Sequence, residues 1–122
     1  MFEIKLESQT INLKWGTWAM ARACKLAGVL TVNDYFSYIQ EDELDISKML
    51  QKHLIMVRAG IEYANEGVCD YTDIGLSGII DELGGIVNNK TLTDYYGYIE
   101  GTMRTNITPL PNSKPAKKKP AK

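Results

Sequence analysis

The feature that most restricts the fold of this chain is a repeated helix signal, a threonine followed by apolar residues at helical spacing and then a glycine. A threonine side chain can accept a hydrogen bond from the first turn of a helix, and glycine readily adopts the left-handed conformation that ends one. The threonines in question are Thr17, Thr31, Thr72 and Thr91. The terminating glycines are Gly28, Gly67, Gly84 and Gly85. The sequence therefore predicts a mainly α protein, a small helical bundle of about five helices joined by short links.

Two of these threonines carry a second signal, because an acidic residue follows three positions later, at Asp34 and at Asp94. This spacing is an acidic variant of the capping box. The longest predicted helix spans about residues 46–65 and follows an acidic connector at residues 41–45, whose charges suit a helix N-terminus. Its apolar stripe consists of Ile46, Leu50, Leu54, Val57, Ile61 and Ala64. We expect this stripe to face the core.

Residues 2–15 show a different period, since apolar and polar side chains alternate as they do in half-buried strands. A two-residue loop at Ser8–Gln9 predicts an N-terminal β-hairpin with its apolar side chains on one face. The expected cross-strand pairs are Phe2 with Trp15, Ile4 with Leu13, Leu6 with Ile11, and Glu3 with Lys14. Because an isolated hairpin is only marginally stable in water, its apolar face must cover the helices, or an edge must pair with a partner's strand.

The 122 residues suit one folded domain, which we place at residues 1–104, followed by a disordered basic tail at residues 105–122. The tail has no acidic residue, and its lysines are Lys114, Lys117, Lys118, Lys119 and Lys122. The domain keeps 9 of the 14 basic residues against all 15 acidic ones, a net charge of −6. Phosphate contacts need lysine and arginine on the folded surface, so we expect nucleic acid to bind only weakly and through the tail.

Residues that carry catalysis or bind metal ions are sparse in this sequence. The single histidine, His53, lies inside the longest predicted helix, and Cys24 and Cys69 are far apart with helix-forming neighbours. A nucleophilic site needs a base beside its nucleophile, and a zinc site needs three or four ligands. The acidic connector lacks the central glycine of a calcium-binding loop. We therefore expect two reduced cysteines, no cofactor, no metal and no enzymatic activity.

The sequence carries no recognisable targeting segment. Its first residues include the acidic Glu3 and Glu7, unlike a signal peptide, and no apolar run reaches the ~20 residues that a membrane span needs. We therefore expect a cytoplasmic protein that does not associate with a membrane.

Tyrosines are the main candidates for a partner-binding surface, because this side chain gives a large contact area with a polar end and is enriched at interfaces. Tyr95, Tyr96 and Tyr98 cluster on the last predicted helix, and Tyr38 lies on the second. Since Tyr38 and Tyr98 fall outside the apolar stripes of their helices, they are the stronger candidates. The alternative is that all of these are ordinary tyrosines at the edge of the core.

The passage from the hairpin into the first helix reads Ile11-x-Leu13-x-Trp15-Gly16-x-x-Ala19-Met20. In this motif, and in its layout of a short hairpin, a small helical domain and a C-terminal segment, the chain resembles the tail assembly chaperones of long-tailed bacteriophages. The resemblance covers residues 1–104 and transfers no catalytic residue. It implies a non-enzymatic protein that binds tail-tube or tape-measure proteins in the host cytoplasm during virion assembly and can self-associate.

The lysine-rich tail supports a second hypothesis, a small DNA-associated regulatory protein. The chaperone hypothesis predicts exposed apolar patches and an aggregation-prone protein partner. The regulator hypothesis predicts salt-sensitive binding to DNA that disappears when residues 113–122 are removed. The net charge of −6 on the domain favours the first.

Overall fold

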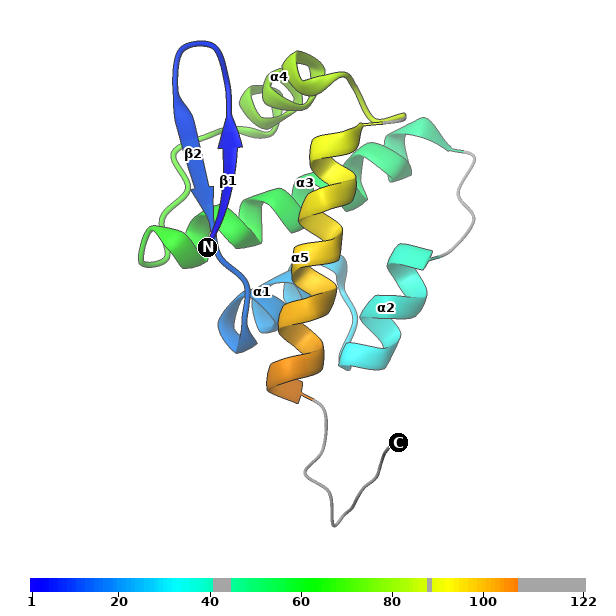
Figure 1. Cartoon of the computed structure of the whole chain (residues 1–122). Helices are drawn as coiled ribbons and strands as arrows, with labels where there is room; N and C mark the ends of the chain where they lie inside the picture. The colour runs from blue at the N-terminus through cyan, green and yellow to red at the C-terminus, as the bar shows by residue number, and fades with distance from the viewer. Residues whose placement is uncertain (41–44, 88, 108–122) are drawn as a thin grey trace.

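The computed structural model describes residues 1–40, 45–87 and 89–107, and it confirms the predicted fold class (Figure 1). The strands are β1 (Phe2–Lys5) and β2 (Thr10–Leu13). The helices are α1 (Thr17–Ala27), α2 (Val32–Gln40), α3 (Ile46–Ala64), α4 (Asp73–Leu83) and α5 (Lys90–Ile107). Because α5 continues to Ile107, the helical domain extends past the predicted boundary at residue 104. From residue 108 on, the predicted tail lies outside the described residues.

Most of the predicted helix ends are confirmed by the hydrogen bonds of their caps. The hydroxyl oxygens of Thr31 and Thr72 each accept a hydrogen bond from the amide three residues later, at 3.0 Å. At the start of α3, the Asp45 carboxylate accepts from two amides of the first turn. Gly28 ends α1 with φ 78°, a left-handed conformation that glycine takes without steric cost.

Two predicted caps are wrong. Thr17 is the first residue of α1 itself, and Gly16 precedes it without any side-chain hydrogen bond to the helix. At α5 the cap is Asn89, whose side-chain oxygen accepts from the Leu92 amide at 3.1 Å, so the helix starts one residue before Thr91. Asn89 is buried and also donates to the Gly85 carbonyl at 2.7 Å, and this second bond holds it in the capping position.

The hairpin forms as predicted, but its register differs by two residues. The observed pairs are Phe2 with Leu13, Glu3 with Asn12, Ile4 with Ile11, and Lys5 with Thr10. The loop is Glu7–Ser8, closed by a hydrogen bond from the Leu6 amide to the Gln9 carbonyl at 2.8 Å. Because side chains alternate between the two faces of a strand, a shift of two residues keeps every side chain on its predicted face.

Residues far away in the sequence form hydrogen bonds that stabilise the observed turn. The backbone amide of Glu7 donates to the Glu82 carboxylate of α4 at 3.2 Å. The hydroxyl of Tyr71 donates to the Gln9 side chain at 3.0 Å. These contacts fix Glu7, the first loop residue, and Gln9, which directly follows the loop.

Helix α3 is the centre of the molecule, and it is buried on more than the one predicted face. It crosses behind α5, with the hairpin and α4 on one side and α1 and α2 on the other (Figure 1). Ile46, at the start of the predicted stripe, is exposed, whereas several residues between the later stripe positions are buried. The buried residues that the single stripe missed are Ile55, Met56, Ala59 and Gly60. Helix α3 therefore packs against neighbours on several sides.

Gly60 allows the hairpin and α5 to approach α3 closely. A Cβ atom at this position would stand 3.1 Å from Cζ of Tyr95 and 3.2 Å from Cβ of Leu13. The Lys14 amide donates to the Gly60 carbonyl at 3.0 Å, which joins the end of the hairpin to the helix. The absence of a side chain at Gly60 thus allows both the hairpin and α5 to pack closely against α3.

The motif that carries the family resemblance lies in this junction. Its apolar residues, Ile11, Leu13, Trp15, Ala19 and Met20, are all buried. A Cβ atom at Gly16 would stand 3.1 Å from the ring of Tyr63. The motif therefore serves the packing of the hairpin onto the helices.

Candidate interaction surface

The tyrosines predicted to bind a partner lie largely in internal contacts. Tyr95 is fully buried, and its hydroxyl donates to the Met56 carbonyl of α3 at 2.8 Å. Tyr98 is half-buried, and its hydroxyl accepts from the Trp15 amide at 3.3 Å. The ring of Phe2 lies 5.2 Å from that of Tyr95 and 5.8 Å from that of Tyr98, measured between centroids. These two tyrosines therefore join α5 to the hairpin and to α3.

Tyr96 of α5 and Tyr38 of α2 both contact side chains of α3. The ring of Tyr96 stacks on His53 with centroids 5.5 Å apart, and its hydroxyl contacts Nδ1 of the imidazole. Burial lowers the pKa of His53 and raises that of Tyr96. The Lys52 ammonium lies 5.0 Å from the centre of the half-buried Tyr38 ring. Both tyrosines keep some exposure, but each already packs against α3.

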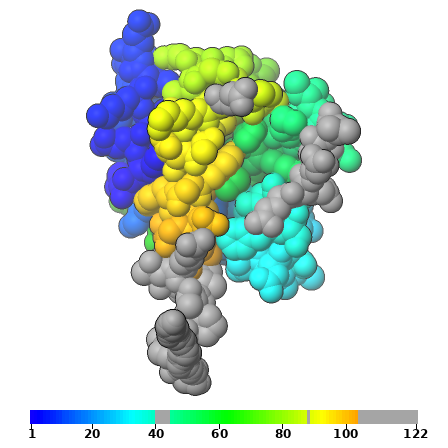
Figure 2. All heavy atoms as spheres, turned by 45° about the vertical axis from the view of Figure 1, so that its right-hand side comes forward, coloured from blue at the N-terminus to red at the C-terminus, as the bar shows by residue number. Residues whose placement is uncertain are grey.

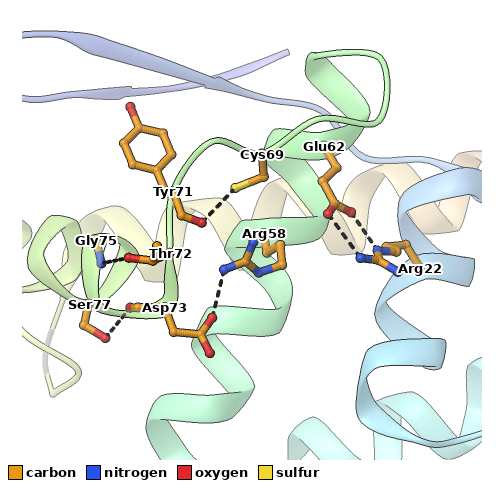
Figure 3. A network of polar contacts seen from close by, with 9 residues as sticks. All are labelled: Arg22, Arg58, Glu62, Cys69, Tyr71, Thr72, Asp73, Gly75 and Ser77. Carbon is orange, nitrogen blue, oxygen red and sulfur yellow. Dashed lines mark hydrogen bonds and ion pairs between the residues drawn. The ribbon is translucent and has the colours of Figure 1, made fainter.

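The polar side chains around α3 form contacts that join helices. Figure 3 shows Arg22 of α1 and Glu62 of α3 facing one another, with Nε and Oε1 2.7 Å apart. Arg58 of α3 lies 2.8 Å from the Asp73 carboxylate at the start of α4. The Glu62 side chain is only 8 % exposed, and its pairing with Arg22 offsets part of the cost of desolvating that carboxylate.

Two nucleophilic side chains of this network, Ser77 and Cys69, contact backbone carbonyls (Figure 3). The Ser77 hydroxyl donates to the Asp73 carbonyl at 2.8 Å, within its own helix. Cys69 lies 3.8 Å from the Tyr71 carbonyl, and Cys24, whose pKa is raised by burial, lies 3.7 Å from that of Thr31. His53 contacts Tyr96 instead. Over residues 1–40, 45–87 and 89–107, no group of three or more His, Cys, Asp or Glu is placed to hold a metal ion.

A groove along α1 is a candidate binding surface. Its volume is about 440 Å³, and it lies between α1 and the segment that leads into α2. The apolar lining consists of Met20, Ala21, Cys24, Val29, Leu30 and Val32. Thr17 and Lys25 supply the polar part of the lining. The groove therefore combines an apolar floor with one cationic side chain.

Leu30 is the most exposed large apolar side chain of the groove, at 94 %. A leucine this exposed does not contribute the ~2 kcal/mol of folding free energy that its burial would provide. It follows Gly28, where α1 ends, and precedes the cap of α2 at Thr31. Sequence reasoning missed this site because it assigned residues 28–31 only to helix ends. The available signal was two consecutive apolar residues in a short link, Val29, which is half-buried, and Leu30, which is exposed.

The other residues predicted to bind partners fall outside the described part of the chain. These are the lysines of the tail, Lys114, Lys117, Lys118, Lys119 and Lys122. Residues 41–44 of the acidic connector also lie outside the described residues. Among the helices that are described, none has both the length and the apolar character needed to cross a membrane.

Comparison with known proteins gives no relative for this chain. No family model, no curated protein and no solved structure matches it.

Proposed function

We propose that this protein is a non-enzymatic binding protein of the tail assembly chaperone class, which holds an aggregation-prone tail-tube or tape-measure protein during virion assembly. The observation that carries the proposal is the apolar groove along α1, with Leu30 almost fully exposed beside it. The family resemblance of residues 1–104 supplies the class of partner. A chaperone of this kind needs an accessible apolar surface and no catalytic group.

The occupant that suits the groove is an apolar segment of the partner with an acidic residue nearby. Met20, Val29 and Val32 offer apolar contacts of the size that one or two aliphatic or aromatic side chains fill. Lys25, which belongs to the same lining, favours a carboxylate at that end. The contact is therefore expected to weaken as salt concentration rises, but not to disappear, since its main part is apolar.

The test is co-expression with the tail-tube protein encoded in the same genome, comparing L30D with I74D. Leu30 and Ile74 are both highly exposed, at 94 % and 86 %, but Ile74 lies on α4, away from the groove. We expect wild type and I74D to raise the soluble fraction of the partner and to co-purify with it. We expect L30D to lose both effects while keeping its own melting temperature. If L30D binds the partner as well as wild type does, the groove is not the binding site. If wild type binds no tail protein, the chain is not a tail assembly chaperone.

A further inference from the structure

The free edge of β1 carries the hydrogen-bonding pattern of a strand that pairs with a copy of itself. In the hairpin, the Leu6–Gln9 pair is hydrogen-bonded, and such pairs alternate along an antiparallel ladder. The amide and carbonyl of Ile4 therefore point toward β2, and those of Glu3 and Lys5 point outward. Within the described residues, no backbone group of another element bonds to the backbone of Glu3 or Lys5.

This edge is accessible. The side chains of Glu3 and Lys5 are exposed, and Figure 2 shows the first residues of the chain, in dark blue, at the surface beside α5. On α5, Gly101 follows one turn after Tyr98, which contacts Phe2. A Cβ atom at Gly101 would meet nothing within 4 Å, so the helix leaves open space there.

The other edge of the hairpin is less suitable. The amide of Lys14, just beyond the end of β2, already donates to the Gly60 carbonyl of α3. The outward residues of β2 are Thr10 and Asn12, which are uncharged and specify no register. An edge strand with unpaired backbone groups is a ready template for a further strand, and here β1 is the edge that retains them.

The charges on β1 select one pairing. Two copies related by a two-fold axis can place Glu3, Ile4 or Lys5 opposite itself. An axis at Glu3 or at Lys5 sets like charges directly opposite one another, which is destabilising. An axis at Ile4 sets Glu3 opposite Lys5 of the second copy, twice, and also joins the outward amides and carbonyls of these residues as hydrogen-bonded pairs. The two Ile4 residues lie opposite one another at the axis, each with its side chain already buried in the core of its own chain.

We propose that two copies of this chain associate through β1, antiparallel and centred on Ile4, to form a continuous four-stranded sheet. This inference does not depend on the proposed function. Strands of four residues bury less surface than the ~1,200 Å² of a standard interface, so the dimer is transient and dissociates on dilution. Closing the edge in this way also removes it as a template for uncontrolled pairing.

Charge reversal tests the pairing, with E3K, K5E and the double variant E3K/K5E compared by sedimentation equilibrium up to about 1 mM protein. Each single variant sets like charges opposite one another, so its dimerisation constant is expected to fall about tenfold or more. The double variant restores opposite charges and the wild-type constant. An equimolar mixture of E3K and K5E is expected to form the heterodimer, because every cross-strand pair is again oppositely charged.

Two controls at exposed positions of other elements match the changes in net charge. D81K on α4 corresponds to E3K, and K48E on α3 corresponds to K5E. Both are expected to dimerise as wild type does. In hydrogen exchange, the Glu3 and Lys5 amides are expected to gain protection as the protein concentration rises. A monomeric wild type, single variants that dimerise like the controls, or a mixture without heterodimer would each overturn the proposal.

Discussion

At Gly60, two segments far apart in the sequence approach the backbone of α3 at one place. The Tyr95 hydroxyl bonds to the Met56 carbonyl one turn earlier, and the Lys14 amide bonds to the Gly60 carbonyl. A glycine inside a helix costs up to about 1 kcal/mol relative to alanine. Here that cost is offset by contacts that a larger residue would prevent.

We therefore expect G60A to destabilise the fold, because the new methyl group would overlap the Tyr95 hydroxyl and crowd Leu13. Overpacking of this kind costs about 1–3 kcal/mol, more than the helix propensity that alanine gains. Urea denaturation measures the difference. The control is G78A on α4, where a Cβ atom would meet nothing within 4 Å and about 0.5–1 kcal/mol of stability should be gained.

The double variant G60A/Y95F locates the cause. Removing the Tyr95 hydroxyl deletes one hydrogen bond, worth about 1 kcal/mol, but also the atom nearest to the added methyl group. G60A should then cost less in the Y95F background than in wild type. Strictly additive effects would show that Tyr95 is not what restricts residue 60.

His53 gives the fold a dependence on pH. Burial lowers its pKa in the folded protein below the ordinary value of 6.5, so the unfolded chain binds the proton more readily. The free energy of unfolding should therefore fall as the pH decreases through 6.5, and it should be constant with respect to this group above that value. Thermal melts of wild type and H53Q between about pH 5 and 8 separate this contribution from that of the carboxylates. Parallel pH profiles would contradict the assignment.

At the scale of elements, the helices were predictable because their signals are local. A capping threonine or a terminating glycine acts within one turn, so Thr31, Thr72 and Gly28 could be assigned without knowledge of the fold. The cap of α5 was assigned incorrectly because Asn89 is fixed by burial and by its bond to Gly85, neither of which a sequence pattern displays.

The corrected cap predicts different effects for two neighbouring substitutions. N89A should lower the free energy of unfolding by about 1 kcal/mol or more, because it removes the cap of α5 and leaves buried polar groups unpaired. T91A should change it by no more than about 0.5 kcal/mol, since Thr91 lies inside the helix. Chemical denaturation of both variants measures this. Equal losses of unfolding free energy in N89A and T91A would contradict the assignment of Asn89 as the cap.

The hairpin register and the surroundings of the tyrosines depended on the whole molecule. Alternation along β1 determined which side chains face the core, but Glu82 and Tyr71, more than 60 residues away, hold the turn. Tyr98 lies off the apolar stripe of α5 and is nevertheless packed, because the hairpin covers that side of the helix. The groove depends on α1 and residues 29–32 together.

Charge is distributed unevenly over the whole molecule, with a net charge of −6 on residues 1–104 and five lysines after them. If the tail binds DNA, removal of residues 113–122 should abolish any gel shift seen at low salt, since it deletes every lysine of the tail. A truncated protein that still shifts DNA would assign binding to the folded domain. No shift with the full chain at low salt would end the regulator hypothesis.

The bond between the Trp15 amide and the Tyr98 hydroxyl spans 83 residues, and Phe2 touches the same tyrosine. On the ribosome the hairpin is made before α5, so Phe2 and Trp15 lack these contacts until α5 has been translated. The hairpin therefore reaches its final packing only after α5 is present. A chain interrupted before α5 presents Phe2 to solvent and to other nascent chains.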